Sequence, residues 1–109
     1  MADYVAPARE IGFVVNELLD YPRLSSLADF TDATEELTGA ILDEAGKFAA
    51  QVLSPLNRIG DQQGVRIEGD TVKTADGFAQ AYQMFVDNQW LSLAQNPEYG
   101  GQGLPFLIH

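Results

Sequence analysis

The chain has no cysteine and only one histidine, His109. The first absence excludes disulfides, thiolate metal sites and cysteine nucleophiles. The second excludes the paired Glu-x-x-His motifs of a di-iron helical bundle and argues against a Ser-His-Asp arrangement. We therefore expect no catalytic residue and no metal ligand within this sequence.

Positive charge is scarce as well. Lys and Arg number 6 against 16 Asp and Glu, which gives a formal net charge of −10. The basic residues are scattered singly, at Arg9, Arg23, Lys47, Arg58, Arg66 and Lys73. Because phosphate binding needs clustered Lys and Arg, we expect no nucleic acid partner and no nucleotide cofactor bound by these residues. Carboxylate pairs such as Asp32 and Glu36 indicate a solvated acidic face.

Long apolar runs are absent too, since none approaches the ~20 residues that cross a bilayer. The N-terminus shows neither a secretory signal pattern nor an Arg-rich transit pattern. We expect a cytoplasmic protein with no membrane insertion. Hydrophobic residues make up 46% of the chain and charged residues 20%, a composition typical of a globular chain. At 109 residues it is one domain at most.

Apolar residues recur at helical spacing in three stretches, 7–21, 32–53 and 76–89. At 1.5 Å per residue the second helix is roughly 33 Å long, so we expect the others to pack against it. The sequence predicts an all-α fold, a helical bundle of about three main helices with a small β-hairpin.

Prolines and threonines predict where these helices begin and end. Pro22 is expected to end the first helix at residue 21, because the residue before proline is disfavoured in the α conformation. Thr31 or Thr34 is expected to cap the second helix. Pro55 should close or kink its far end, and residues 57–64 are expected to form a polar loop.

The hairpin is predicted over residues 65–74, where apolar and polar residues alternate around a Gly-Asp turn. In that register Ile67 faces Val72, and Arg66 lies opposite Lys73 as a mild like-charge conflict. Two strands alone are only marginally stable, so we expect a small appendage.

The last twenty residues are the most informative. Gly100, Gly101 and Gly103 precede Pro105, and a proline after a glycine run is typical of a helix start. We expect the sequence to be the front portion of a longer protein, ending where its next helix begins. The glycines could cradle an anion on backbone N–H groups. The preceding strand of a dinucleotide fingerprint is missing, however, so a tight turn is the favoured interpretation.

Aromatic residues gather on the third helix and beyond it, at Phe78, Tyr82, Phe85, Trp90 and Tyr99. They could form a stacking platform for a flavin or a base. Aromatic residues at helical spacing ordinarily belong to the core, so the sequence favours core packing.

Four patterns together give the chain a family resemblance: Tyr4-Val5-Ala6-Pro7, Glu10-x-x-Phe13-Val14-Val15-x-Glu17-Leu18-Leu19, Pro55-Leu56-Asn57, and Trp90 followed by Pro97-Glu98-Tyr99-Gly100-Gly101-Gln102-Gly103-Leu104-Pro105. With them, nearly the whole chain resembles the N-terminal helical domain of the acyl-CoA dehydrogenases, in the bacterial branch with an extended N-terminus. Gly12 and Ser92 depart from the family pattern, at positions that do not touch the chemistry.

The resemblance implies a larger three-domain enzyme. Residues 1–109 would be its truncated N-terminal helical domain, without the middle β domain and the C-terminal helical bundle. Such enzymes are FAD-dependent oxidoreductases of fatty acid metabolism. They remove a proton and a hydride from the α and β carbons of an acyl-CoA and pass the electrons to electron-transferring flavoprotein. For the parent protein we expect FAD, acyl-CoA, this flavoprotein and a homo-oligomer, and for the segment alone no bound cofactor and no activity.

The resemblance also implies that one turn lies near the acyl end of the substrate pocket, formed by Tyr99, Gly100, Gly101, Gln102, Gly103 and Leu104. The family's glutamate base has no counterpart in this chain. Two alternatives stay open: an autonomous helical interaction module without enzymatic activity, and an acyl-CoA oxidase that uses oxygen as its acceptor.

Overall fold

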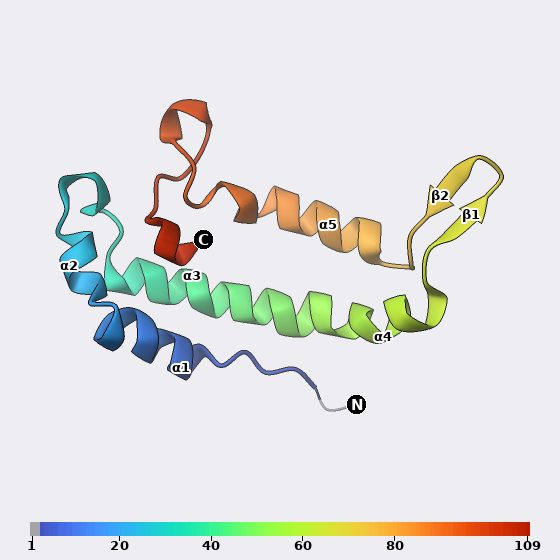
Figure 1. The fold of residues 1–109 in the computed structure, drawn as a ribbon, viewed down its shortest axis with the longest axis horizontal. Helices are drawn as coiled ribbons and strands as arrows, with labels where there is room; N and C mark the ends of the chain where they lie inside the picture. The colour runs from blue at the N-terminus through green and yellow to red at the C-terminus, as the bar shows by residue number, and fades with distance from the viewer. Residues whose placement is uncertain (1–2) are drawn as a thin grey trace.

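The computed structural model describes residues 3–109 as helices joined by short turns, with one β-hairpin (Figure 1). The elements in chain order are α1 (Ala8–Phe13), a π turn (Val14–Leu18), α2 (Tyr21–Ser25), a 3-10 turn (Ala28–Phe30), α3 (Glu35–Phe48), a π turn (Ala49–Leu53), α4 (Ser54–Gln63), β1 (Arg66–Glu68), β2 (Thr71–Lys73), α5 (Phe78–Asp87), and 3-10 turns at Trp90–Ser92, Pro97–Tyr99 and Phe106–Ile108. The predicted class, all-α with three main helical runs and one hairpin, is confirmed.

The longest helical run joins α3 to α4. Thr34 caps its start, because the Thr34 hydroxyl accepts a hydrogen bond from the Leu37 N–H at 3.2 Å. The polar loop predicted at 57–64 is wrong, because the helix continues to Gln63. It ends at Gly64, whose φ of 62° is a left-handed value that suits glycine.

Pro55 does not close this helix, so of the two predicted effects, closing or kinking, the first is wrong. A proline inside a helix lacks the N–H and its ring collides with the carbonyl four residues earlier. Here the π turn Ala49–Leu53 comes just before it, and the Ser54 N–H donates to the Ala49 carbonyl, five residues back. This wider turn changes the hydrogen-bond register locally, so the helix passes through the proline and continues.

The first helical run ends earlier than predicted. It passes from α1 into a π turn and stops before Asp20, which has a φ of 51°. Pro22 lies in the first turn of α2 instead of ending the preceding helix. Proline is accepted there because first-turn N–H groups have no helical partner. The predicted end at residue 21 is therefore wrong.

The hairpin has the predicted register. Strands β1 and β2 pair antiparallel, with Ile67 opposite Val72 and Arg66 opposite Lys73. Arg66 Nε donates to Glu68 at 2.9 Å, which reduces the like-charge conflict and raises the pKa of Arg66. Every strand residue is exposed, so the hairpin projects from the helices (Figure 1).

A small closed core lies where the first helical run, α2, α3 and the C-terminal turn meet. Its apolar members are Val15, Tyr21, Leu24, Ile41 and Ile108. The side chain of Tyr21 is 0% exposed. Its hydroxyl donates to the Ala33 carbonyl at 2.7 Å and accepts from the Thr38 hydroxyl at 2.8 Å. We call this cluster the Tyr21 core.

The main helices lie side by side in one layer. Viewed down the shortest axis, the first run, the α3–α4 run and α5 spread across the plane and none covers another (Figure 1). The molecule measures 54 × 37 × 16 Å, with a radius of gyration of 17.3 Å. A compact chain of this length has about 13 Å. Domains normally bury their apolar stripes between two packed layers, so this arrangement leaves apolar surface open.

Candidate functional site

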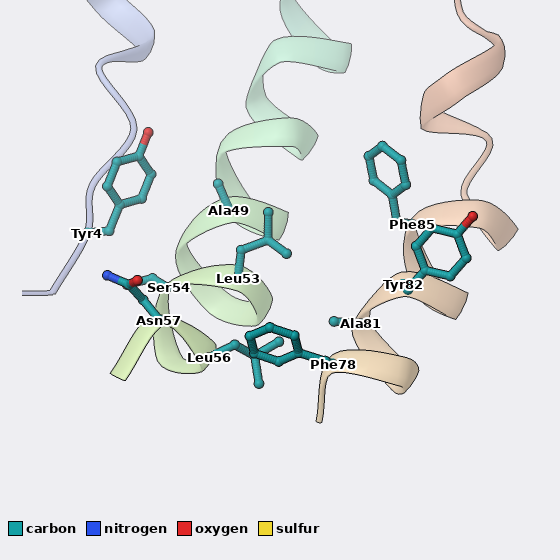
Figure 2. Close-up of a pocket in the computed structure, with 10 residues that line it drawn as sticks. All are labelled: Tyr4, Ala49, Leu53, Ser54, Leu56, Asn57, Phe78, Ala81, Tyr82 and Phe85. Carbon is teal, nitrogen blue, oxygen red and sulfur yellow. The ribbon is translucent and has the colours of Figure 1, made fainter. Parts of the chain in front are cut away.

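A groove of about 690 Å³ separates the α3–α4 run from α5 (Figure 2). Ten side chains line it: Tyr4, Ala49, Leu53, Ser54, Leu56, Asn57, Phe78, Ala81, Tyr82 and Phe85. Phe78 reaches from α5 toward α4, where its ring lies against Gly60, so that a Cβ at Gly60 would stand 2.6 Å from the ring. We call this hollow the α4–α5 groove.

The α5 wall of the groove follows from helical spacing. Phe78, Ala81, Tyr82 and Phe85 stand at i, i+3, i+4 and i+7, which places them on one face. Ala81 is buried, but Phe78 is 40% exposed and Tyr82 is 64% exposed. The prediction that these two aromatic residues belong to the core is wrong, because no helix within residues 3–109 forms a second layer over this face.

The chemistry of the groove is apolar. None of its ten lining residues, all within the described part of the chain, carries a charge. Its polar groups are the Ser54 hydroxyl, the Asn57 amide and the hydroxyls of Tyr4 and Tyr82. Such a surface offers nothing to balance a phosphate, whereas it suits an acyl chain or the apolar face of a polypeptide.

A second cavity, of about 470 Å³, lies beside Trp90. Its lining residues are Ala40, Ile41, Glu44, Phe48, Gln51, Val52, Met84, Asn88, Trp90, Leu93 and Gln102. Here the ring of Phe48, on α3, lies near two aromatic rings of the α5 region. Its centroid is 6.2 Å from that of Phe85 and 6.4 Å from that of Trp90. Trp90 is half-buried, and its indole N–H is shielded from solvent with no acceptor among the described residues.

Charged groups stay outside both hollows or at their rims. At the Trp90 cavity, Lys47 Nζ donates to Glu44 at 2.6 Å, and this bond raises the pKa of Lys47. The pair is exposed, so it contributes little to stability. Within residues 3–109, acidic and histidine side chains form no cluster that could hold a metal ion. No helix in the same range is long and apolar enough to cross a bilayer.

The turn predicted near an acyl pocket, residues 99–104, folds back on residues 92–95. Every backbone N–H from Gly100 to Leu104 donates to a carbonyl of this chain, over distances between 2.9 and 3.1 Å. The acceptors are the carbonyls of Pro97, Asn96, Ser92, Gln95 and Leu93. No N–H in this run is left to cradle an anion, so that alternative is wrong and the tight turn is confirmed.

Glycine is required in this turn for two different reasons. Gly100 and Gly103 have φ values of 89° and 66°, which strain other residues. Gly101 instead lies so close to Gln95 that a Cβ would overlap the Gln95 carbonyl. The glycine run therefore has a structural cause in the described chain.

The six residues of the predicted site do not line the α4–α5 groove. Gln102 borders the Trp90 cavity. Tyr99 is 84% exposed, so its predicted place in the core is also wrong. Helical periodicity could not locate the α4–α5 groove, because it identifies an apolar face without telling whether another element covers it.

No protein-family model matches the chain. Over 105 residues the chain is 36% identical to the 3-methylmercaptopropionyl-CoA dehydrogenase of Ruegeria pomeroyi. The match covers 96% of this chain but 18% of the relative, so the chain spans less than a fifth of that protein's length. The resemblance to acyl-CoA dehydrogenases is confirmed by this match.

Proposed function

We propose that this chain is the N-terminal helical domain of an FAD-dependent acyl-CoA dehydrogenase, an enzyme that dehydrogenates an acyl-CoA between its α and β carbons. The observation that carries the proposal is the 36% identity over 96% of the chain to a dehydrogenase named for an acyl-CoA substrate. The remaining domains, a middle β domain and a C-terminal helical bundle, would come from sequence outside these 109 residues.

Neither the α4–α5 groove nor the glycine turn offers FAD a site for its phosphates. The α4–α5 groove has no charged residue, and the N–H groups of the glycine turn are all bonded within the chain. A dinucleotide needs donors or cations for its phosphates. In the proposed enzyme the other domains therefore hold FAD and supply the catalytic base, and no carboxylate of this chain takes that role.

The proposed contribution of this chain is to shape the acyl side of the substrate pocket and to pack against the other domains. The walls of the α4–α5 groove are uncharged and mostly apolar. They favour this role because binding of an acyl chain depends more on excluding water than on polar contacts. Residues 99–104 do not line this groove, so in the proposal their turn would reach the acyl end of the pocket separately. We include cytoplasmic location, a homo-oligomeric parent and electron-transferring flavoprotein as its acceptor in the same proposal.

A chimera tests the proposal. The matching segment of the Ruegeria pomeroyi relative is replaced by this chain, and the purified chimera is assayed for bound flavin and for oxidation of 3-methylmercaptopropionyl-CoA. We expect a yellow protein that retains activity within about tenfold of the relative, since domain packing tolerates substitutions that keep volume and pattern. A relative with the segment deleted is the control and is expected to be inactive. A folded, monodisperse chimera that neither binds flavin nor oxidises the thioester would overturn the proposal.

A second function, an interaction module without enzymatic activity, is favoured by the open α4–α5 groove, because exposed apolar patches mark interaction sites. The chimera separates the two functions. An active chimera supports the enzyme domain, whereas a module with unrelated packing would leave the chimera colourless.

A further inference from the structure

We propose that the hairpin is a contact between two copies of the parent protein. The outer edge of β1 pairs antiparallel with β1 of the second copy, about a two-fold axis that passes between the two Ile67 residues. The two hairpins then form one four-stranded sheet, in the order β2–β1–β1–β2. This inference goes beyond the proposed function, which names a homo-oligomeric parent without assigning a surface to it.

The hairpin has no strand beside it within the described residues. β1 and β2 form a sheet of two strands, so in residues 3–109 nothing pairs with the outer edge of β1. Ile67 and Val72 lie opposite each other on one face and are 75% and 64% exposed. Two strands alone are marginally stable, whereas three or more with an apolar face hold together. A second hairpin supplies the missing strands.

The charges of β1 are complementary to those of the same strand in a second copy. The strand reads Arg66-Ile67-Glu68. Antiparallel pairing about Ile67 therefore places Arg66 of each copy opposite Glu68 of the other. Opposite charges that face each other across strands stabilise the pair, whereas like charges destabilise it. Because Arg66 Nε lies 2.9 Å from Glu68 within one copy, the two side chains share a face, and four alternating charges would meet there.

The outer edge of β2 does not have this property. It reads Thr71-Val72-Lys73, so the same kind of pairing would set Lys73 opposite Thr71 of the second copy, without a carboxylate. Lysine on an edge strand is one of the means by which proteins prevent edge-to-edge pairing. The β1 edge therefore favours pairing and the β2 edge opposes it, so the sheet ends at four strands.

The hairpin is also a place where two acidic molecules can meet. The chain carries a net charge of −10, but residues 65–74 are neutral, with Arg66 and Lys73 against Glu68 and Asp70. Like net charges repel each other. Because the hairpin projects from the helices (Figure 1), two hairpins can pair while the acidic helices stay outside the contact.

Single cysteines test the strand order, since the chain has no cysteine of its own. They are placed in the chimera described above, which contains the other domains, and in the 109-residue chain. In the proposed sheet the two Ile67 Cα atoms lie about 5 Å apart, within the range of a disulfide. Ile67→Cys should therefore cross-link two copies on mild oxidation.

Val72→Cys is the matched control on the other strand. The two Val72 residues are separated by three strand spacings, about 14 Å, which a disulfide cannot span. This variant should not cross-link. The chimera without either substitution measures any cross-linking through the relative's own cysteines, and circular dichroism checks that each variant keeps the helical content of its parent.

Charge reversal in the Ile67→Cys background tests the register. Arg66→Glu places two carboxylates opposite each other, and Glu68→Arg places two guanidinium groups opposite each other, so each variant alone should cross-link poorly. A mixture restores opposite charges in the mixed pair, and its cross-linked fraction should exceed that of either variant alone by about fivefold. The hydrogen bond within one copy is lost in both variants, so it cannot account for the recovery.

Cross-linking at Ile67 but not at Val72, recovered when the two charge variants are mixed, is the expected result. Equal cross-linking at the two positions would overturn the proposal, as would no cross-linking at Ile67 or no recovery on mixing. So would a cross-link in the 109-residue chain that is absent from a folded chimera, because another domain then covers the hairpin. A colourless chimera contradicts the proposed function alone, and cross-linking of the chain then decides the role of the hairpin.

Discussion

Two tyrosines mark the contrast between the two ends of the molecule. Tyr21 is fully buried, and its hydroxyl has two hydrogen-bond partners, the Ala33 carbonyl and the Thr38 hydroxyl. Tyr82, on the apolar face of α5, is 64% exposed in the α4–α5 groove. Both tyrosines lie on α-helices, so helix type does not explain this difference. It arises because α2 and the C-terminal turn cover α3 at one end, while no described element covers α4 and α5 at the other.

The connection between α4 and α5 helps to explain why their end stays open. The residues that join these helices form the hairpin, which projects outward instead of folding back over the groove (Figure 1). The base of the hairpin is fastened by Gln63, whose amide donates to the Asp76 carboxylate at 3.1 Å and accepts from the Asp76 N–H at 2.8 Å. This clamp joins the ends of the two helices and leaves the middle of the groove uncovered.

The largest expected effect compares alanine at the two tyrosines. Tyr21→Ala should lower the free energy of unfolding by about 4 kcal/mol, because it leaves a cavity in a closed core. Tyr82→Ala should change it by no more than about 0.5 kcal/mol, as for exposed positions. Urea unfolding followed by circular dichroism measures both.

If Tyr21→Ala does not fold, Tyr21→Phe keeps the comparison measurable. Phenylalanine retains the ring and removes the hydroxyl, leaving the Ala33 carbonyl without its buried donor. We expect a loss of about 1–3 kcal/mol, against essentially none for Tyr82→Phe. Equal losses at the two positions would mean that the two ends of the molecule do not differ in stability.

Alanine substitutions at two glycines, one in the C-terminal turn and one beside the α4–α5 groove, test how far the neighbouring atoms can move. At Gly101→Ala the new methyl group overlaps the backbone of Gln95, which is held in the turn by hydrogen bonds. We expect a loss of about 2 kcal/mol. At Gly60→Ala the methyl group meets the tip of the Phe78 ring, which is 40% exposed and can swing toward solvent. The gain in helix propensity, about 1 kcal/mol, should offset that displacement.

Thermal unfolding of these two glycine variants supplies the measurement, with Gly39→Ala as the control for helix propensity alone. A Cβ at Gly39 meets no atom within 4 Å, so this variant should be stabilised by about 1 kcal/mol. A loss at Gly60→Ala as large as that at Gly101→Ala would show that the groove is rigid and closed in solution.

Local chemistry made the hairpin and the turns predictable from sequence. The Ile67–Val72 pairing follows from alternation around a Gly-Asp turn, and the tight turn before Pro105 follows from the glycine run, in which Gly100 and Gly103 have positive φ values. These features depend on a few neighbouring residues. The predicted end of the helix at Pro55 was wrong, because a π turn before the proline changes the hydrogen-bond register there and the helix continues.

Burial was less predictable than helix formation. The periodicity of α5 correctly identified a helix and an apolar face, but whether Phe78 and Tyr82 are covered depends on elements distant in sequence. The same limit applies to the candidate site. The place of the Tyr99–Leu104 turn near a substrate pocket was predicted from a family resemblance, whereas the α4–α5 groove arises from how two helices and the N-terminal segment lie together. No residue pattern within α5 alone contains that information.

The smallest effect concerns the helix start beside the Tyr21 core. Thr34→Ala removes the cap on the Leu37 N–H and should cost about 1 kcal/mol, while Thr31→Ala, for which the structure gives no capping bond, should cost much less. The Ala33 carbonyl accepts the hydrogen bond from the Tyr21 hydroxyl, and Ala33 immediately precedes the cap residue Thr34. The buried hydrogen bond and the cap therefore hold the same turn. In a double-mutant cycle with Tyr21→Phe, measured by urea unfolding, we therefore expect a coupling of at least about 0.5 kcal/mol. Additive losses would mean that the buried hydroxyl and the cap stabilise the closed end independently of each other.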